Sequence, residues 1–230
     1  MDAIILAAGL GTRLRPHTLT TPKPLLPVQG RPILDWALAA LPAEVDRLLV
    51  VVNYLAEQVE AYLGGQKHVP AWEAVRQEVP RGTGDALRSC RDRVRSDRFL
   101  VLNGDDLYGA ADLDELARHP AGLLAQPVDE PRRFGIAFLK ADGTLDRLVE
   151  KPDLEGPQLA NTGAYVFPRQ VLSEELKLSP RGEYEITDHL TTLARTGSVA
   201  VVRAKFWLPI GDVAAWQRAQ TLDLAGPLTR

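Results

Sequence analysis

Short, unbroken runs of apolar residues alternate with stretches of helical periodicity in the first half of the chain. The runs contain mainly aliphatic and β-branched residues, and a glycine-rich turn follows the first of them at once. Because apolar and polar positions do not alternate within these runs, they predict strands buried on both faces, as in a parallel sheet covered by helices. The predicted strands are residues 2–8, 48–53 and 99–103, and the predicted helices are residues 33–41, 55–63 and 85–94.

The pattern changes beyond about residue 120. Extended segments there are short and separated by turn residues, which predicts an antiparallel or mixed addition to the sheet. The chain as a whole is therefore predicted to be an α/β protein, with a mixed, mostly parallel sheet flanked by helices and a small antiparallel addition in the C-terminal half. The predicted strands here are residues 134–139, 144–149, 160–167 and 199–202, and the predicted helices are residues 169–176, 183–195 and a last one after Asp212.

The chain of 230 residues is long enough for one sizeable hydrophobic core. No linker, internal repeat or low-complexity tract divides it. We therefore expect a single domain over residues 1–230.

Composition excludes several classes of protein. The chain is 45% hydrophobic and 25% charged with a net charge of -3, which is typical of a soluble globular protein and unlike a general nucleic-acid binder. No run approaches the roughly 18 apolar residues of a membrane span, so we expect a cytoplasmic protein without membrane contact. The single cysteine, Cys90, has no partner for an internal disulfide, and the four histidines lack metal-ligand spacing, so redox and zinc chemistry are not expected.

The loop after the first strand carries candidate phosphate-binding groups. Gly9 and Gly11 let the backbone approach a ligand closely, and Arg13 offers a planar guanidinium to phosphate oxygens. Lys23 lies between two prolines that stiffen the chain around it. Taken alone, Gly-x-Gly is equally consistent with a tight turn. Leu14 stands where a dinucleotide fingerprint needs a third glycine, and no Walker motif follows.

A longer segment makes the assignment specific. Residues 6–34 read LAAGLGTRLRPHTLTTPKPLLPVQGRPIL, which strongly resembles the amino-terminal signature of the sugar-phosphate nucleotidyltransferases. The resemblance implies a Rossmann-like core with a nucleotide-binding half over about residues 1–120 and a sugar-phosphate-binding half over about residues 121–230. It also implies dependence on Mg²⁺. The implied substrates are a nucleoside triphosphate and a sugar 1-phosphate, whose phosphate attacks the α-phosphorus and releases pyrophosphate. Sparser matches continue at Gln77, Gly82, Gly104, Asp105, Phe134, Gly135, Glu150, Lys151, Pro152, Asn161, Thr162, Gly163 and residues 182–188.

This chemistry needs cations rather than a general base. A sugar 1-phosphate has a second pKa of about 6, so it is already a dianionic nucleophile at neutral pH. The protein must hold two anions in line and stabilise the leaving pyrophosphate. Asp105 follows a buried strand, the usual place for ligand-binding residues, and we assign it to Mg²⁺, with Asp106 as a candidate second ligand. A turn or cap role is the alternative for Asp105.

The resemblance implies two sets of contacts. Gln77 resembles the glutamine that reads a pyrimidine base, and its amide can pair with the N3–H and O4 of uracil or thymine, or with cytosine when turned over. Lys151 resembles the lysine that binds the sugar phosphate, and Glu150 the carboxylate that binds sugar hydroxyls; a solvated pair at a strand end is the alternative. Arg181 resembles a second phosphate contact, or is a surface arginine. The implied nucleotide-binding residues are Ala7, Ala8, Gly9, Gly11, Thr12, Arg13, Gln77, Gly82 and Asp105, and the sugar-phosphate-binding residues are Gly135, Glu150, Lys151, Asn161, Thr162 and Arg181, with Arg13, Lys23, Asp105 and Lys151 as the catalytic group.

One position departs from the family. The family that the chain resembles usually carries an aspartate, sometimes an asparagine, in a Trp-x-Asp-x-Gly segment near the carboxyl end, where it supplies a second magnesium contact. Here Pro209 occupies that position between Trp207 and Gly211. Three outcomes remain open: Asp212 replaces the ligand, Asp105 and Asp106 hold the ion with substrate and water, or activity is lost.

Three functions therefore compete. The first is an active nucleotidyltransferase that uses dTTP or UTP. The second is a catalytically silent binding module on the same fold, for which Pro209 is the only support. The third is an enzyme that uses CTP or GTP, or another phosphorylated acceptor. The sugar, regulation and any oligomeric state are not indicated by the sequence.

Overall fold

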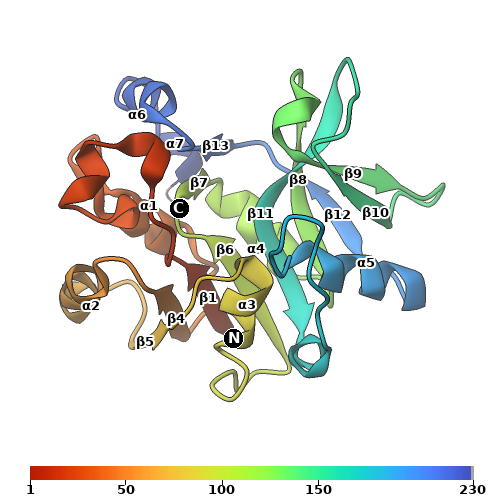
Figure 1. Ribbon diagram of the computed structural model, residues 1–230, viewed down its shortest axis with the longest axis horizontal. Coiled ribbons are helices and arrows are strands. Elements are labelled where there is room, and N and C mark those ends of the chain that lie inside the picture. The colour runs from red at the N-terminus through yellow and green to blue at the C-terminus, as the bar shows by residue number, and fades with distance from the viewer. Residues whose placement is uncertain (229–230) are drawn as a thin grey trace.

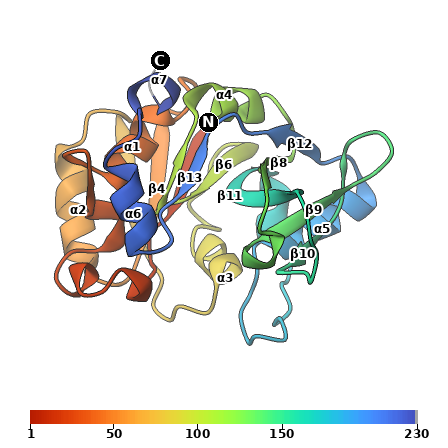
Figure 2. The same ribbon diagram turned by 90° about the horizontal axis from the view of Figure 1, so that it is seen from above.

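In the computed structural model, which describes residues 1–228, a sheet of nine strands lies between helices (Figures 1 and 2). Seven of these strands follow the order β10-β9-β11-β6-β1-β4-β5, while β8 pairs with β11 and β12 pairs with β8. Their bounds are β1 (Asp2–Leu6), β4 (Arg47–Val52), β5 (Ala71–Arg76), β6 (Arg98–Asn103), β8 (Gly122–Val128), β9 (Gly135–Leu139), β10 (Leu145–Glu150), β11 (Gln158–Pro168) and β12 (Ala200–Arg203).

The first half of the chain forms the parallel part of this sheet. β1 pairs in parallel with both β4 and β6, and β4 pairs in parallel with β5. The three strands predicted there are confirmed, although β1 ends at Leu6, two residues early. β5 was not predicted, because it is an edge strand with exposed residues such as Trp72 and Arg76 and therefore lacks a continuous apolar run.

The second half supplies the antiparallel part. β11 runs antiparallel to β6, β8 and β9, and β9 pairs antiparallel with β10. The remaining strand of this sheet, β12, pairs in parallel with β8. The predicted fold class, a mixed and mostly parallel sheet with an antiparallel addition, is thus confirmed.

Helices cover both faces of the parallel strands, as the unbroken apolar runs require. Ala3 and Ile5 face a core formed with α1 (Ile33–Ala40), α2 (Ala56–Gly65) and α4 (Ala110–Ala117). Ile4, between them on β1, faces the opposite core, formed with α3 (Thr83–Arg88) and α5 (Thr187–Thr196). Successive strand residues point to opposite faces, so β1 is buried on both sides.

A third apolar cluster joins the two ends of the chain. Leu14 and Ile33 from the N-terminal segment pack with Leu107, Ile210 and Ala219. This contact brings α6 (Val213–Ala219) and α7 (Ala225–Leu228) beside the N-terminal loops (Figures 1 and 2). Small pairings support it: β7 (Asp106–Tyr108) with β13 (Trp207–Pro209), and β2 (Pro27–Val28) with β3 (Arg31–Pro32).

Three predicted helices are wrong in extent. α3 ends at Arg88 rather than continuing to residue 94, because the Asp2 carboxylate binds the backbone N–H groups of Arg95 and Ser96 and draws the chain into turns. Residues 169–176 contain only a 3-10 helix, Arg169–Ser173. α5 begins at Thr187 rather than at residue 183, because the backbone of Tyr184 bonds to Arg81 and Gly84.

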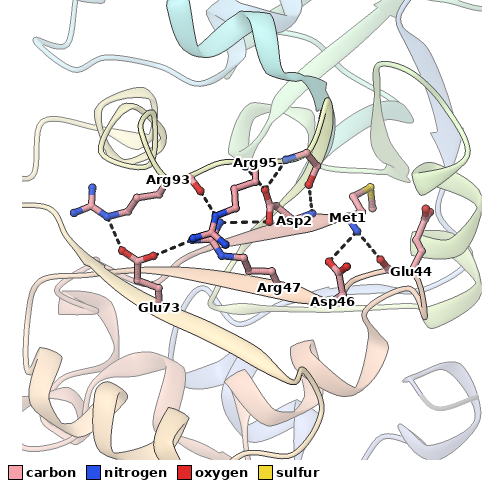
Figure 3. Close-up of polar contacts among 9 residues, drawn as sticks. Met1, Asp2, Glu44, Asp46, Arg47, Glu73, Arg93 and Arg95 are labelled. Atoms are coloured by element: carbon pink, nitrogen blue, oxygen red, sulfur yellow. Dashed lines mark hydrogen bonds and ion pairs between the residues drawn. The ribbon is translucent and has the colours of Figure 1, made fainter.

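A polar network closes the amino-terminal edge of the parallel strands (Figure 3). Asp2 Oδ2 accepts hydrogen bonds from the N–H groups of Arg95 at 2.5 Å and Ser96 at 2.9 Å, and Arg47 lies 3.6 Å from Asp2 Oδ1. Arg47 also bonds to Glu73 at 2.9 Å. Burial opposes ionisation of Asp2, but these donors outweigh it and lower its pKa. The network therefore anchors the sheet at the edge opposite the candidate site. Within residues 1–228, no helix combines the length and apolarity needed to cross a membrane.

Candidate active site

The carboxyl ends of β1 and β6 meet at one edge of the sheet, and Asp105 lies just beyond them. Gly104 donates its N–H to the Leu6 carbonyl at 2.9 Å, which holds the two strand ends together. A Cβ on Gly104 would come within 2.9 Å of the Leu6 carbonyl and of the Ile5 side chain. Glycine at this position therefore places Asp105 directly beside the loop that leaves β1.

The N-terminal loop folds back on itself around Gly11. Gly11 has a φ of +61°, and a Cβ there would lie 2.9 Å from Thr18 and 3.2 Å from Lys23. The Thr18 hydroxyl donates to the Gly11 carbonyl at 2.8 Å. This close packing, which only glycine allows, brings Lys23 under the loop and toward Asp105.

Lys23 and Asp105 form an ion pair at the centre of the site. The Lys23 side chain is 8% exposed, whereas that of Asp105 is 38% exposed. The lysine is thus held in the wall of the site, and the carboxylate is open to a ligand.

A first cavity, of about 350 Å³, opens beside this pair. Its walls combine the loop after β1, the segment that carries Gln77 and the start of α3. Gly11 and Thr12, which were predicted as nucleotide contacts, are not among the residues that line it. The predicted residues that do line it are Ala7, Ala8, Gly9, Lys23, Gln77, Gly82 and Asp105.

Gln77 is held firmly in the wall of this first cavity. Its backbone N–H bonds to the Val52 carbonyl at 3.0 Å, and its carbonyl accepts from the Asn53 side chain at 2.6 Å. Its side-chain Nε2 donates to Asp85 at 2.9 Å and to the Gly82 carbonyl at 3.3 Å. The amide is therefore oriented before any ligand arrives.

A second cavity, of about 500 Å³, lies on the other side of Asp105. The two cavities share Thr83, Asn103 and Asp105 as their common wall. Arg13, predicted as a nucleotide contact, faces this second cavity. The predicted residues in its lining are Arg13, Asp105, Asp106, Gly135, Glu150, Asn161, Thr162, Arg181 and Asp212.

Asp106 is a buried carboxylate at the start of β7, next to Asp105. It accepts a hydrogen bond from Trp207 Nε1 at 3.2 Å and lies opposite Pro209 in the pairing of β7 with β13. Burial, followed by the negative charge of Asp105, raises the pKa of Asp106 to about 8. Two carboxylates crowded in this way favour a bound cation.

Asp212 lies in a different environment. Its Oδ1 accepts from the Ala215 N–H at 2.8 Å, so it caps α6. Its Oδ2 lies 3.7 Å from Arg133, and Arg218 and Arg13 also act on it. The Ala215 hydrogen bond and these arginines lower the pKa of Asp212. Its carboxylate thus already has arginines around it, which makes these surroundings unfavourable for a metal ion.

The predicted sugar-phosphate residues gather at the rim of the second cavity. Arg181 bonds to Glu185 at 2.7 Å and lies 3.5 Å from Glu150. Lys151 Nζ is 3.8 Å from Glu150, and the Lys151 N–H bonds to the Phe134 carbonyl at 2.9 Å. Lys151 is not itself in the lining, but it contacts Glu150 and Phe134, which are.

Asn161 and Thr162, both on β11, already have hydrogen-bond partners. The Asn161 amide donates to the Tyr165 hydroxyl at 2.8 Å and accepts from the Gly163 N–H at 3.1 Å. The Thr162 hydroxyl donates to the Leu124 carbonyl at 2.9 Å. Asn161 thus offers an oriented amide at the cavity, whereas the Thr162 hydroxyl is committed to the sheet.

Residues 2–226 match the nucleotidyl transferase family. The chain belongs to this family. Members of sugar-phosphate type resemble it over nearly its whole length, which confirms the family resemblance found in residues 6–34.

Three relatives illustrate the likeness. The bifunctional protein GlmU of Methanocaldococcus jannaschii is 35% identical over 214 residues, which cover 92% of this chain and 51% of the relative. A glucose-1-phosphate thymidylyltransferase of Streptomyces griseus is 33% identical over 93% of this chain and 63% of its own. A crystal structure of a glucose-1-phosphate thymidylyltransferase from Bacillus anthracis, assigned as putative and bound to sucrose, superposes with a TM-score of 0.86 at 30% identity, covering 99% of this chain and 98% of that one. The chain spans about half the length of the GlmU relatives that it matches.

Sequence reasoning missed several residues that line the two cavities or lie beside them. Asn103, the last residue of β6, lies at a strand end like Asp105 and could have been found by the same argument. Arg133 and Arg218 come from a 3-10 helix and from α6, and only the tertiary fold brings them to Asp212. Asp85 has no motif that signals its contact with Gln77.

Proposed function

We propose that this protein condenses a sugar 1-phosphate with dTTP or UTP to give a nucleotide sugar and pyrophosphate, in a reaction that depends on Mg²⁺. The supporting observation is the shared wall: two cavities of different chemistry meet at Asp105 and Asn103. A transfer reaction between two substrates requires two binding sites that adjoin at the reacting atoms.

The first cavity suits a nucleotide. The loop at Ala7, Ala8 and Gly9 lines one side. The Ala7 N–H is bonded to the Val51 carbonyl at 2.8 Å, so the N–H groups of Ala8 and Gly9 are the ones that could approach phosphate oxygens closely. Gln77 offers an oriented amide on another side, with the chemistry to bind the edge of a pyrimidine. Lys23 stands at the end nearest Asp105, where the phosphates would lie.

The second cavity suits a phosphorylated sugar. Glu150 and Asn161 provide a carboxylate and an amide for hydroxyl groups, and Arg181 provides a guanidinium for a phosphate. Lys151 adds a positive charge at the rim. We assign Gly135 and Thr162 to this site as lining residues.

Asp105 and Asp106 fit a magnesium ion. Carboxylate oxygens are its preferred protein ligands, and it is commonly bound by one or two carboxylates together with substrate phosphates and water. The raised pKa of Asp106 reflects a repulsion that a divalent cation relieves. Within residues 1–228, no cluster of three or more potential metal-binding side chains occurs, so substrate and water would complete the shell. Bound there, the ion would neutralise charge that develops on the phosphates.

Cationic side chains would compensate the rest of the phosphate charge. A sugar 1-phosphate needs no proton removed at neutral pH, so no general base is required. Lys23 would compensate the phosphate charge at the junction of the cavities, and Arg13 would do so from the second cavity. Lys23 is preorganised by burial and by its ion pair with Asp105, whereas Arg13 is an exposed side chain carried by the 3-10 helix Thr12–Leu14.

A screen of pyrophosphate release tests the proposal. dTTP, UTP, CTP and GTP would each be incubated with a panel of sugar 1-phosphates and Mg²⁺, with Asp105→Asn as the matched control. We expect release with dTTP or UTP and at least one sugar 1-phosphate, and at least about a 10²-fold loss in Asp105→Asn. Binding of nucleotide without release would favour the silent module that Pro209 suggests. Release only with CTP or GTP would overturn the choice of base.

A further inference from the structure

Asp85 is a buried carboxylate beside the first cavity, which is the proposed nucleotide cavity, but it is not part of the lining. Its side chain is 8% exposed. It lies in the first turn of α3, and its two oxygens have different partners. Oδ2 accepts from Gln77 Nε2 at 2.9 Å, and Oδ1 lies 3.2 Å from an Arg81 guanidinium nitrogen. Burying a carboxylate costs free energy unless hydrogen bonds and ion pairs compensate for its lost hydration. The partners of Asp85 therefore indicate its role.

The carboxylate determines which end of the Gln77 amide points where. An ionised carboxylate only accepts hydrogen bonds, so it must face the NH₂ end of the amide. The second N–H of that group is directed to the Gly82 carbonyl at 3.3 Å, another pure acceptor. With both N–H groups directed to acceptors, Gln77 is left with Oε1 as the atom that it offers to a ligand in the cavity it lines.

Arg81 supports this arrangement. Its guanidinium pairs with Asp85, and its backbone carbonyl accepts the Tyr184 N–H at 2.8 Å. Gly82 and Gly84 let Tyr184 approach: a Cβ on Gly82 would come within 2.5 Å of the Tyr184 carbonyl. Through Arg81, Asp85 is thus linked to the segment around Tyr184, which belongs neither to α3 nor to the segment that carries Gln77.

We propose that Asp85 is a positioning residue that makes the nucleotide cavity selective for a base with a ring N–H at its recognised edge, uracil or thymine, over cytosine. This inference rests on the proposed function. The N3–H of uracil or thymine donates to Gln77 Oε1, whereas N3 of cytosine is an acceptor and would face that oxygen with no proton between them. A site built to receive a hydrogen bond discriminates strongly against a ligand that lacks the donor.

Asp85→Asn is the test, because it preserves shape while removing the constraint. An asparagine amide both donates and accepts, so the constraint from Asp85 is lost and only the longer contact with the Gly82 carbonyl, at 3.3 Å, still favours the NH₂ end of Gln77. We expect the preference for dTTP or UTP over CTP, measured as the ratio of kcat/KM, to fall at least about tenfold. KM for the sugar 1-phosphate should not change, since Asp85 lies outside the second cavity. Asp92→Asn, an exposed aspartate beyond α3, is the control and should keep the wild-type ratio.

A second substitution separates positioning from a general structural role. In Asp85→Asn combined with Gln77→Glu, the introduced asparagine can donate to the new carboxylate. The oxygen that replaces Nε2 loses the bond to the Gly82 carbonyl, but the other oxygen is an acceptor whichever way the carboxylate turns. The preference for dTTP or UTP should therefore return. A folded Asp85→Asn protein with the wild-type ratio, or a double variant that stays unselective, would overturn the inference.

Direct binding distinguishes this inference from the proposed function. Calorimetric titration with dTTP, UTP and CTP, each without a sugar phosphate, measures the base preference even when no transfer occurs. Wild-type protein that binds dTTP or UTP more tightly than CTP, with the difference lost in Asp85→Asn, supports the inference whether or not pyrophosphate is released. Equal binding of all three nucleotides contradicts the inference and leaves the proposed reaction standing. Absence of nucleotide binding contradicts both.

Discussion

Lys23 and Asp105 form a direct ion pair although 82 positions separate them in the chain. The lysine comes from the proline-flanked end of the N-terminal loop, and the aspartate follows β6. The ion pair balances the charges of the two side chains at the point where the cavities meet. Lys23 is buried there, and Asp105 is partly exposed. A phosphate entering the first cavity would offer Lys23 a second anion, and Asp105 could then share its charge with a metal ion.

Lys23→Ala should lower the rate of pyrophosphate release by on the order of 10² or more, the usual cost of deleting one preorganised charge contact. The physical reason is twofold: the phosphates lose a cation, and Asp105 loses its partner. Initial rates at saturating substrate and Mg²⁺ measure this effect. Lys67→Ala, an exposed lysine beyond α2 and outside both cavities, is the control. Equal rates for Lys23→Ala and Lys67→Ala would contradict the assigned role.

The structure also makes a prediction about which carboxylate compensates for Pro209. Asp106→Asn should raise the Mg²⁺ concentration needed for half-maximal activity by about tenfold or more, because it removes one of two adjacent carboxylates. Asp212→Asn should leave that concentration unchanged, since asparagine caps a helix about as well as aspartate does. Titration of activity with Mg²⁺ at fixed substrate compares the two. The reverse order of effects would show that Asp212 has taken the metal-binding role.

The sequence predicted the parts of the site that depend on local signals. Asp105 was found because a buried strand ends just before it, and the loop around Gly9 and Gly11 because glycine marks close backbone approach. The environment of Asp212 was not predictable, since its cap lies on α6 while Arg133 comes from the other half of the site. The same holds for the start of α5, which Tyr184 delays through backbone bonds to residues about 100 positions earlier. Such contacts leave no periodic trace in the chain.

The polar network at the amino-terminal edge should make stability depend on pH. The pKa of Asp2 is lower in the folded protein than in the unfolded chain, so the unfolded chain binds the proton more readily. Its contribution is therefore complete above the unfolded value of about 4 and is lost as the pH falls through the folded value. Asp2→Asn should lower the free energy of unfolding by about 1–3 kcal/mol at pH 7. Thermal unfolding of both proteins between pH 7 and pH 3 should show this difference shrinking below about pH 4. A difference that grows on acidification would contradict the assignment.

Gly163 lies on β11 with a φ of +79°, pressed against Asn103 in the wall shared by both cavities. A Cβ there would lie 2.0 Å from Asn103 Nδ2, so Gly163→Ala must displace that side chain, which also lowers the pKa of Asp106. We expect a loss of activity of about tenfold or more, because small misplacements at a reacting centre are costly.

Gly156→Ala is the matched control: Gly156 has a similar φ of +75°, but its Cβ would meet no heavy atom within 4 Å. Both variants should lose about 1–2 kcal/mol of stability to the left-handed backbone, and Gly163→Ala should lose more. Only Gly163→Ala should slow pyrophosphate release, and an equal loss of activity in both would show that backbone strain, rather than the position of Asn103, is responsible.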